Sequence, residues 1–209
     1  MPLVQTSLPA LEPVSLADVK ANSRIVDTYD DNLIPLLISA ARRYAEAFTG
    51  RSFITQGWKL VLDAFPGGCG LGFAPYGEIY SQPDNAILLD RGNVLSIGSI
   101  TYLDMSGAQQ TVPTSTYVAD LSGAPARVAP VFGQIWPIPM PQIGAVQVNY
   151  TAGYGPAATD VPEGIRHWIL TRVATIYENR EEVAVLQKGK LEVLPYIDTL
   201  LDPYCVVQA

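Results

Sequence analysis

The pattern of apolar and polar positions divides the chain into a helical beginning, a strand-rich middle and a helical end. Between residues 32 and 50, apolar side chains recur on one helix face: Leu33, Leu37, Ala41, Tyr44 and Phe48. The charged residues of this helix fall on the opposite face: Arg42, Arg43 and Glu46. Asn32 is expected to cap the helix, Pro35 lies in its first turn, and Gly50 suits its C-terminal end.

A shorter helix over residues 15–22 precedes it. Ser15 and Asp18 predict this helix, because they form a capping-box pattern with Asp in place of Glu. Residues 1–14 are expected to be extended, with prolines that block regular strand pairing.

The middle of the chain, from residue 51 to about 156, has the character of short strands. Its β-branched and aromatic segments are bounded by Gly, Pro or Asp, and they cover residues 58–63, 86–89, 99–103, 117–119 and 145–150. Asp104 to Gly107 reads as a hairpin turn. The spacing of the turn signals predicts an all-β lobe of about five to seven strands.

A helical pattern returns after Val161, with Pro162 in its first turn, and extends to about Arg180. Its core stripe is expected to be Ile165, Ile169, Val173 and Ile176. A further short helix is predicted over residues 194–201.

The two long helices lie at opposite ends of the chain, and neither buries its apolar stripe alone. The predicted fold is therefore α+β: a small helical bundle formed by the N- and C-terminal helices, with an inserted antiparallel β-lobe. The expected division is an arm and helices of the core over 1–50, the β-lobe over 51–160, and C-terminal helices with a tail over 161–209.

Composition narrows the classes of function. The chain has 209 residues, 48% of them hydrophobic and 16% charged, which is typical of a folded protein. Its net charge of −7 and its lack of a basic run disfavour tight binding to nucleic acid. No export signal or membrane-spanning segment is expected, so Cys69 and Cys205 are interpreted as reduced thiols.

Candidate chemistry is sparse. His167, the only histidine, has no second His or Cys at a suitable spacing, so a structural role is expected. The glycines between Gly67 and Gly72 fail the spacing of a phosphate loop and lack its lysine. We therefore expect no catalytic residue, no cofactor and no metal site.

Two alternatives remain open from the residues alone. Eleven tyrosines and three tryptophans could form a carbohydrate-binding platform on the β-lobe, as in a virion decoration protein. A hydrolase could use two carboxylates held across a cleft. The uncharged C-terminal segment is expected to be buried, either on its own domain or against a neighbouring protein.

Six segments in order resemble the head–tail connector (adaptor) family of tailed bacteriophages, which has relatives in gene transfer agents. They are EPVSLADVK (12–20), ISAARRYAE (38–46), TGRSFITQ (49–56), YTAGYG (150–155), VPEGIR (161–166) and YENRE (177–181). The resemblance covers both helical ends of the chain and the edges of the β-lobe.

This resemblance implies a structural virion protein without enzymatic activity. Family members form a ring, commonly of twelve subunits, between the portal protein and a stopper or other tail-side protein, and the ring leaves a channel for double-stranded DNA without binding it specifically. The implied location is the head–tail junction of the virion, with assembly in the cytoplasm of the bacterial host.

The resemblance also suggests contact residues. The candidate portal contact is the tail: Tyr204, Cys205, Val206, Val207, Gln208 and Ala209. The candidate contacts between subunits are Arg42, Arg43, Glu46, Arg172, Glu178, Arg180 and Glu181.

Overall fold

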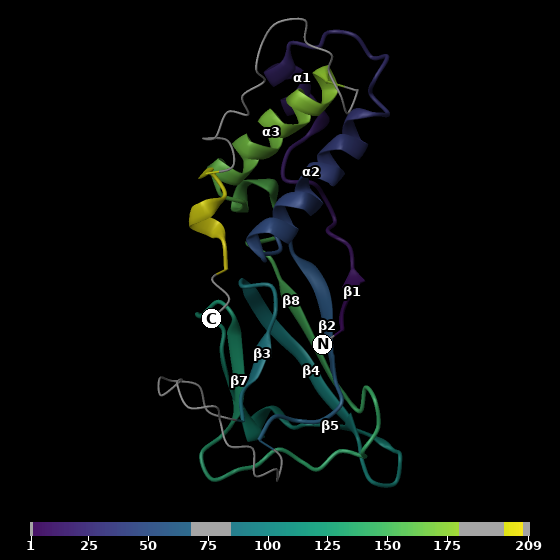
Figure 1. The fold of residues 1–209 in the computed structure, drawn as a ribbon, viewed down its shortest axis with the longest axis vertical. Helices are drawn as coiled ribbons and strands as arrows, with labels where there is room; N and C mark the ends of the chain where they lie inside the picture. The colour runs from purple at the N-terminus through teal and green to yellow at the C-terminus, as the bar shows by residue number, and fades with distance from the viewer. Residues whose placement is uncertain (1, 68–84, 180–198, 207–209) are drawn as a thin grey trace, which may run out of the picture. The chain divides into compact units, whose positions relative to one another are not determined.

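The computed structural model describes residues 2–67, 85–179 and 199–206 and divides them into two compact units (Figure 1). A β unit contains residues 2–8 and 56–152, and a helical unit contains residues 9–55 and 153–206, apart from the undescribed ranges. Each unit has its own hydrophobic core. The predicted α+β class is confirmed.

The helical unit contains α1 (Leu16–Ser23), α2 (Ile34–Thr49) and α3 (Glu163–Glu178). The capping box of α1 is confirmed: the Asp18 N–H donates to Ser15 Oγ at 3.1 Å, and the Ser15 N–H donates to Asp18 Oδ2 at 2.8 Å. The bonds that the Ser15 N–H and hydroxyl donate to the Asp18 carboxylate lower the pKa of Asp18. The described part of this unit also contains two short 3₁₀ helices, η2 (Ala158–Asp160) and η3 (Asp202–Tyr204).

The start of α2 differs from the prediction. Leu33 occupies the N-cap without a side-chain bond, so the expected cap at Asn32 is wrong. Backbone turns take over its role, since the N–H groups of Leu33 and Ile34 donate to the carbonyl of Asp30. Pro35 lies in the first turn as expected, and Gly50 ends the helix with a φ of 68°.

The predicted packing of α2 against α3 is confirmed. The stripe predicted for α2 is confirmed at Ala41, which is buried, and at Leu37, which packs against the core, but it is wrong at Tyr44 and Phe48. Its buried apolar residues are Ile34, Ile38, Ala41 and Ala45, whereas Tyr44 and Phe48 are about half exposed. On α3, Ile165, Ile169 and Val173 are buried as expected, together with Trp168, and Ile176 is half-buried. Because the apolar residues of α2 cover a broad arc of the helix, periodicity alone did not select which part of that arc faces the core.

The β unit contains two antiparallel sheets. The larger has the order β1-β2-β8-β4-β5, formed by β1 (Leu3–Ser7), β2 (Gln56–Leu62), β8 (Val146–Ala152), β4 (Val94–Leu103) and β5 (Gln109–Thr111). The smaller has the order β3-β7-β6, formed by β3 (Ile87–Leu89), β7 (Ala126–Pro130) and β6 (Tyr117–Asp120).

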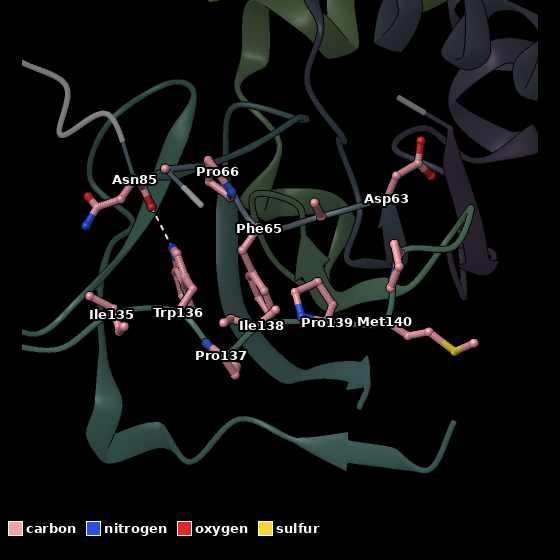
Figure 2. Close-up of a pocket in the computed structure, with 13 residues that line it drawn as sticks. Asp63, Phe65, Pro66, Asn85, Ile135, Trp136, Pro137, Ile138, Pro139 and Met140 are labelled. Atoms are coloured by element: carbon pink, nitrogen blue, oxygen red, sulfur yellow. Dashed lines mark hydrogen bonds between the residues drawn. The ribbon is translucent and has the colours of Figure 1, made fainter. Parts of the chain in front are cut away.

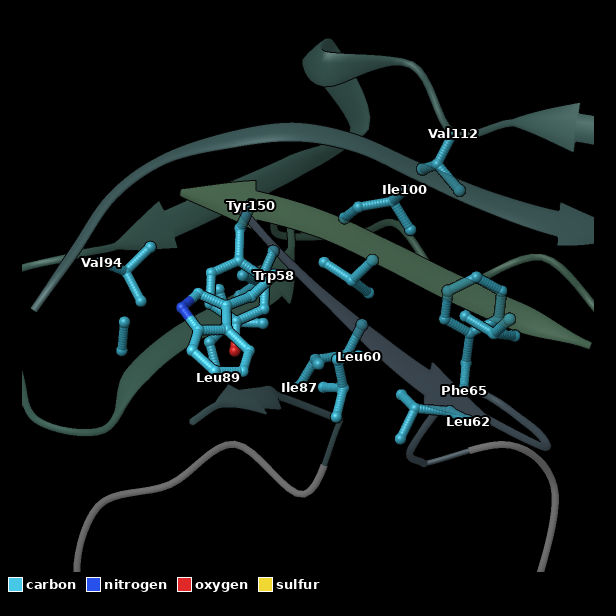
Figure 3. Close-up of a cluster of buried hydrophobic side chains, with 14 of the residues drawn as sticks. Trp58, Leu60, Leu62, Phe65, Ile87, Leu89, Val94, Ile100, Val112 and Tyr150 are labelled. Atoms are coloured by element: carbon cyan, nitrogen blue, oxygen red, sulfur yellow. The ribbon is translucent and has the colours of Figure 1, made fainter. Parts of the chain in front are cut away.

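Alternation along β2 and β8 builds the core of this unit. Every second residue is buried, and the register sets Trp58 opposite Tyr150 and Leu60 opposite Val148. Figure 3 shows Trp58, Leu60 and Tyr150 gathered with Ile87, Leu89 and Ile100. The alternation of apolar and polar residues predicted β2 and β8 because each of these strands buries one face.

The sequence did not predict three of the observed strands: β1, β5 and β7 (Ala126–Pro130). The expectation that prolines block pairing in residues 1–14 is wrong for Leu3–Ser7, which lies between Pro2 and Pro9 and pairs with β2. The hairpin turn at Asp104–Gly107 is confirmed between β4 and β5. There the Asp104 N–H donates to the Ala108 carbonyl, and Gly107 has a φ of 81°. The helix expected over 194–201 lies mostly outside the described residues.

Candidate assembly interface

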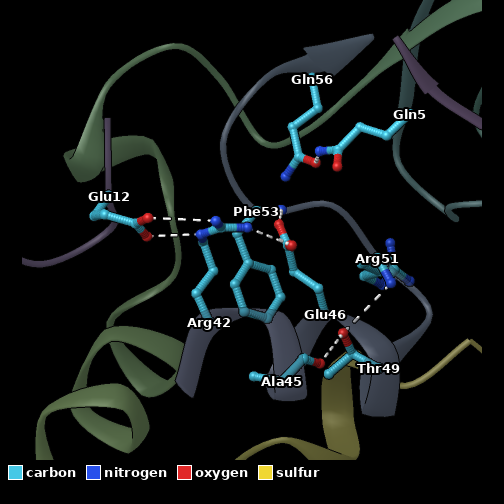
Figure 4. A network of polar contacts seen from close by, with 9 residues as sticks. All are labelled: Gln5, Glu12, Arg42, Ala45, Glu46, Thr49, Arg51, Phe53 and Gln56. Atoms are coloured by element: carbon cyan, nitrogen blue, oxygen red, sulfur yellow. Dashed lines mark hydrogen bonds and ion pairs between the residues drawn. The ribbon is translucent and has the colours of Figure 1, made fainter. Parts of the chain in front are cut away.

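A buried ion network joins the end of α2 to the segment that follows it (Figure 4). Arg42 donates through Nε to Glu12 Oε2 at 2.6 Å and through Nη1 to Glu46 Oε2 at 2.7 Å. The other oxygen of Glu46 accepts the Phe53 N–H at 2.9 Å. The network therefore fixes the path of the chain where the helix ends.

Burial governs the chemistry of this network. Arg42 and Glu46 are only 3% and 7% exposed. Burial by itself lowers the pKa of Arg42, but the hydrogen bonds to Glu12 and the attraction of Glu46 raise it above its ordinary value. Arg42 and Glu46, predicted to contact a neighbouring subunit, are thus placed inside the chain with their polar atoms bound to internal partners.

The other residues predicted to contact neighbouring subunits differ in exposure. Arg43 and Glu178 are exposed. Arg172 is half-buried, and its guanidinium carbon lies 5.7 Å from the centre of the Tyr44 ring. Arg180 and Glu181 lie outside the described residues. An intersubunit role for the exposed residues remains a prediction.

The outer face of α2 is apolar. It contains Leu36, Ala40, Tyr44, Ala47 and Phe48, all exposed, and its only charged residue is Arg43. The rings of Tyr44 and Phe48 are nearly parallel with centres 6.4 Å apart, and Tyr44 also stacks on the buried Trp168 at 5.8 Å. The aromatic pair is therefore held in one orientation on the helix surface. We call these six residues the α2 outer face.

The described part of the C-terminal tail is bound to the end of α2. The Val206 N–H donates to the Thr49 carbonyl at 2.8 Å, and Arg51 Nε donates to the Tyr204 carbonyl at 2.6 Å. Val206 also packs on Gly50, where an added Cβ would lie 3.4 Å from the Val206 Cβ. Val207, Gln208 and Ala209 lie outside the described residues. The tail thus follows a fixed path as far as Val206.

Cys205 belongs to the same tail and is a free thiol. Its Sγ lies 3.5 Å from the Leu201 carbonyl, and desolvation raises the pKa of the thiol. A raised pKa keeps the thiol protonated and makes it a poor nucleophile. Cys69, the other cysteine, lies outside the described residues.

The β unit has an apolar pocket of about 420 Å³ (Figure 2). Phe65 and Trp136 stack at its wall with ring centres 4.9 Å apart, and Trp136 Nε1 donates to the Asn85 carbonyl at 2.6 Å. Ile135 and Ile138 form its exposed rim. Asp63 is the only ionisable group among the lining residues, so the pocket suits an apolar side chain better than a polar substrate.

No cluster of catalytic groups emerges in the described part of the chain. His167 is exposed on α3, and none of the described His, Cys, Asp and Glu residues form a group that could hold a metal ion. Asp30 accepts a hydrogen bond from the Tyr177 hydroxyl at 2.7 Å. Of the glycine-rich segment only Gly67 is described.

The carbohydrate-binding alternative requires exposed aromatic rings. In the described part of the β unit, Trp58, Trp136, Phe65 and Tyr150 are all buried, and Phe132 is the only fully exposed ring. One exposed ring does not make a stacking platform, so these residues do not support that alternative.

Membrane insertion was not expected from the sequence. Within the ranges that the structure describes, every helix is too short or too polar to cross a bilayer.

Comparison with known proteins gives one family. The model of the phage gp6-like head-tail connector protein family matches residues 13–92, which include α1, α2, β2 and β3. No curated protein matches the chain. The family match confirms the resemblance inferred from the sequence over residues 13–92.

Solved structures share the fold at 18% identity. A chain from the neck of an empty gene transfer agent particle superposes with a TM-score of 0.77, covering 100% of this chain and 97% of that chain. A chain from the virion of a native gene transfer agent particle gives 0.74 with the same coverage. A third, from a native particle neck computed with C12 symmetry, gives 0.64 over 99% and 97%. The likeness spans both units.

Proposed function

We propose that this chain, which resembles the phage head–tail connector family, is a structural connector subunit at the head–tail junction of a virion. The observation that carries the proposal is the family match over residues 13–92. The shared fold with chains of gene transfer agent particles extends the likeness over the whole length. A connector acts by docking to other proteins, and no catalytic step is proposed.

The proposal includes a ring of copies of this chain, with twelve as the expected number. One of the solved neck structures was computed with twelve-fold symmetry and another with six-fold symmetry, which supports a cyclic arrangement. The ring would lie between the portal protein and a stopper or other tail-side protein. The net charge of −7 suits a channel through which DNA passes without being held.

We further propose that different parts of the chain have different roles in assembly. The helical ends, expected over 1–50 and 161–209, form the assembling core, and the β-lobe, expected over 51–160, widens the ring or touches capsid or tail proteins. The tail from Tyr204 to Ala209 is the proposed portal contact. Because its first three residues are bound to the end of α2, the last three residues, 207–209, are proposed to make the contact itself.

The mass of the purified chain, alone and after mixing with portal rings, tests the proposal. We expect the chain to join the portal in a complex of fixed stoichiometry, seen by native mass spectrometry. A chain that stays monomeric and ignores the portal would contradict the connector function.

Two truncations test the tail separately. Deleting residues 207–209 is expected to abolish portal attachment while leaving the fold intact, because the anchoring bonds of Tyr204 and Val206 remain. Deleting residues 204–209 should abolish attachment as well and also remove those bonds. Unchanged attachment by both truncated chains would refute the role of the tail and leave the connector proposal standing.

A further inference from the structure

We infer that the α2 outer face binds the α1–α2 loop (residues 24–33) of a second copy of this chain, in a head-to-tail contact. The inference rests on the proposed ring and names the two surfaces that would close it. Both surfaces belong to the helical unit, and they are different parts of it.

The acceptor surface is a continuous apolar face on α2. Leu36 is 67% exposed, Tyr44 53% and Phe48 47%. Ala40 and Ala47 lie between them, and such small residues let another backbone approach the helix closely. Covering this face would remove three large apolar side chains from water, which favours association.

The donor surface is an exposed pair of apolar side chains on a fixed loop. Val26 is 96% exposed and Tyr29 is 89% exposed. Lys20 Nζ donates to the Asp27 carbonyl at 2.8 Å and forms an ion pair with Asp31. The Tyr29 N–H donates to Asp27 Oδ1 at 3.3 Å. The loop is therefore organised before binding, which lowers the entropic cost of docking.

Charge is complementary between the two surfaces. The acceptor has Arg43 and the neighbouring Arg172, and it has no carboxylate. The donor loop has the exposed Asp27 beside Val26, with Asp30 and Asp31 following and Arg24 preceding. Docking would bring Asp27 toward the arginines. In an acidic protein this pairing of unlike patches favours one orientation of the copies.

The same charges disfavour a symmetric dimer of two α2 faces. In a two-fold contact this face would meet a second copy of itself, so the charges brought together would all be arginines, and like charges repel. A contact between two different surfaces avoids this repulsion. In a pair joined this way, one copy keeps a free donor and the other keeps a free acceptor, so the contact propagates until a ring closes.

A charge placed in the acceptor tests the inference. Ala47→Glu keeps a good helix former but puts a carboxylate opposite the acidic loop, and we expect self-association on portal rings to weaken by about 100-fold. Thr175→Glu, at an exposed position of α3, is the matched control and should assemble as the wild type does. Equal assembly of the two variants would overturn the inference.

A charge exchange tests the pairing itself. Arg43→Glu and Asp27→Arg should each weaken assembly, and the double variant should restore it to within about tenfold of the wild type. If the double variant is as defective as the sum of the single variants, the two residues do not meet and the inference is wrong.

Photo-crosslinking identifies the occupant directly. A benzoylphenylalanine in place of Tyr44, in a mixture of isotopically light and heavy chains on portal rings, should link to residues 24–33 of another copy. Links to residues 180–198 of the same chain, to the portal, or to nothing would each refute the inference. If the wild-type chain forms no complex with the portal, the proposed connector function is wrong. If the complex forms but the expected link is missing, only the inferred contact between copies is wrong.

Discussion

The two faces of α2 reverse the arrangement of a typical surface helix: charged residues lie on the buried face and apolar residues on the exposed face. The inner face contains Arg42 and Glu46, buried together beside Ile34 and Ile38. The outer face presents Leu36, Tyr44 and Phe48, with Arg43 as its single charge. A helix of an isolated globular protein usually buries its apolar stripe and exposes its charges.

This difference indicates that the two faces of α2 serve different purposes: the inner face fixes the path of the chain, and the outer face is available for assembly. The inner charges hold a geometry: Glu46 accepts the Phe53 N–H and Arg42 binds Glu12, so the chain leaves α2 along a fixed path. Buried ion pairs contribute little net stability compared with apolar residues, and they are best understood as fixing one arrangement. On the outer face Tyr44 packs against Trp168 on one side only, and Leu36, Tyr44 and Phe48 all keep about half or more of their surface exposed, which is why we assign them to assembly.

The largest expected effect comes from breaking the inner network. Arg42→Ala leaves Glu12 and Glu46 without their cation in a buried site, and we expect a loss of about 3–5 kcal/mol in the free energy of unfolding of the helical unit. Arg43→Ala, the adjacent exposed position, should change it by less than about 0.5 kcal/mol. Urea unfolding followed by circular dichroism compares the two, and similar losses would contradict the assignment of faces.

A smaller effect is expected from apolar truncations on the two faces. Ile38→Ala removes a buried side chain against α3 and should cost about 2–5 kcal/mol, because a cavity remains. Leu36→Ala on the outer face should leave the stability within about 0.5 kcal/mol and weaken assembly instead. Thermal unfolding and native mass spectrometry together make the distinction. A destabilised Leu36→Ala would show that this face is covered within the chain.

The smallest expected effect on stability comes from the exposed carboxylate of Asp104, in contrast to the buried pair Arg42 and Glu46. Hydrogen bonds from the side chains of Ser106 and Gln110 lower the pKa of Asp104 from 3.8 to about 2. Since the folded pKa is depressed, the stabilisation is fully present above the unfolded value and is lost as the pH falls from about 4 toward 2.

Asp104→Asn isolates this contribution. The difference in unfolding free energy between this variant and the wild type should be small near neutral pH, should shrink below about pH 4, and should vanish only below about pH 2. A difference that stays constant over this range would show that the carboxylate does not titrate as its hydrogen bonds imply.

Much of the fold follows from local pattern. The capping box of α1, the turn at Asp104–Gly107 and the alternation in β2 and β8 all depend on residues close in sequence or on one strand face. The edge strands β1 and β5 did not. Prolines flank β1, and β5 (Gln-Gln-Thr) is polar and exposed, so neither carries the apolar signal that predicted the equally short β3 and β6.

The candidate interface was predictable only in part. The sequence placed Arg43 correctly at an exposed position on α2, and the apolar residues Tyr44 and Phe48 were recognised as one stripe. They were assigned to the core, however, because an apolar stripe on an isolated helix is normally buried. Burial of Arg42 depends on Glu12, which is thirty residues away in the chain. Helical periodicity does not contain that information.

The sequence by itself determined the class of the fold, the turns and caps, and the resemblance to head–tail connectors, because these depend on local residue chemistry and on the order of short motifs. Only the tertiary structure decided which face of α2 is inside and where the tail lies after Leu201. The physical reason is that a helix with two apolar faces can pack in two ways, and the choice is made by distant partners: Trp168 on α3, Glu12 before α1, and the chain returning at Tyr204.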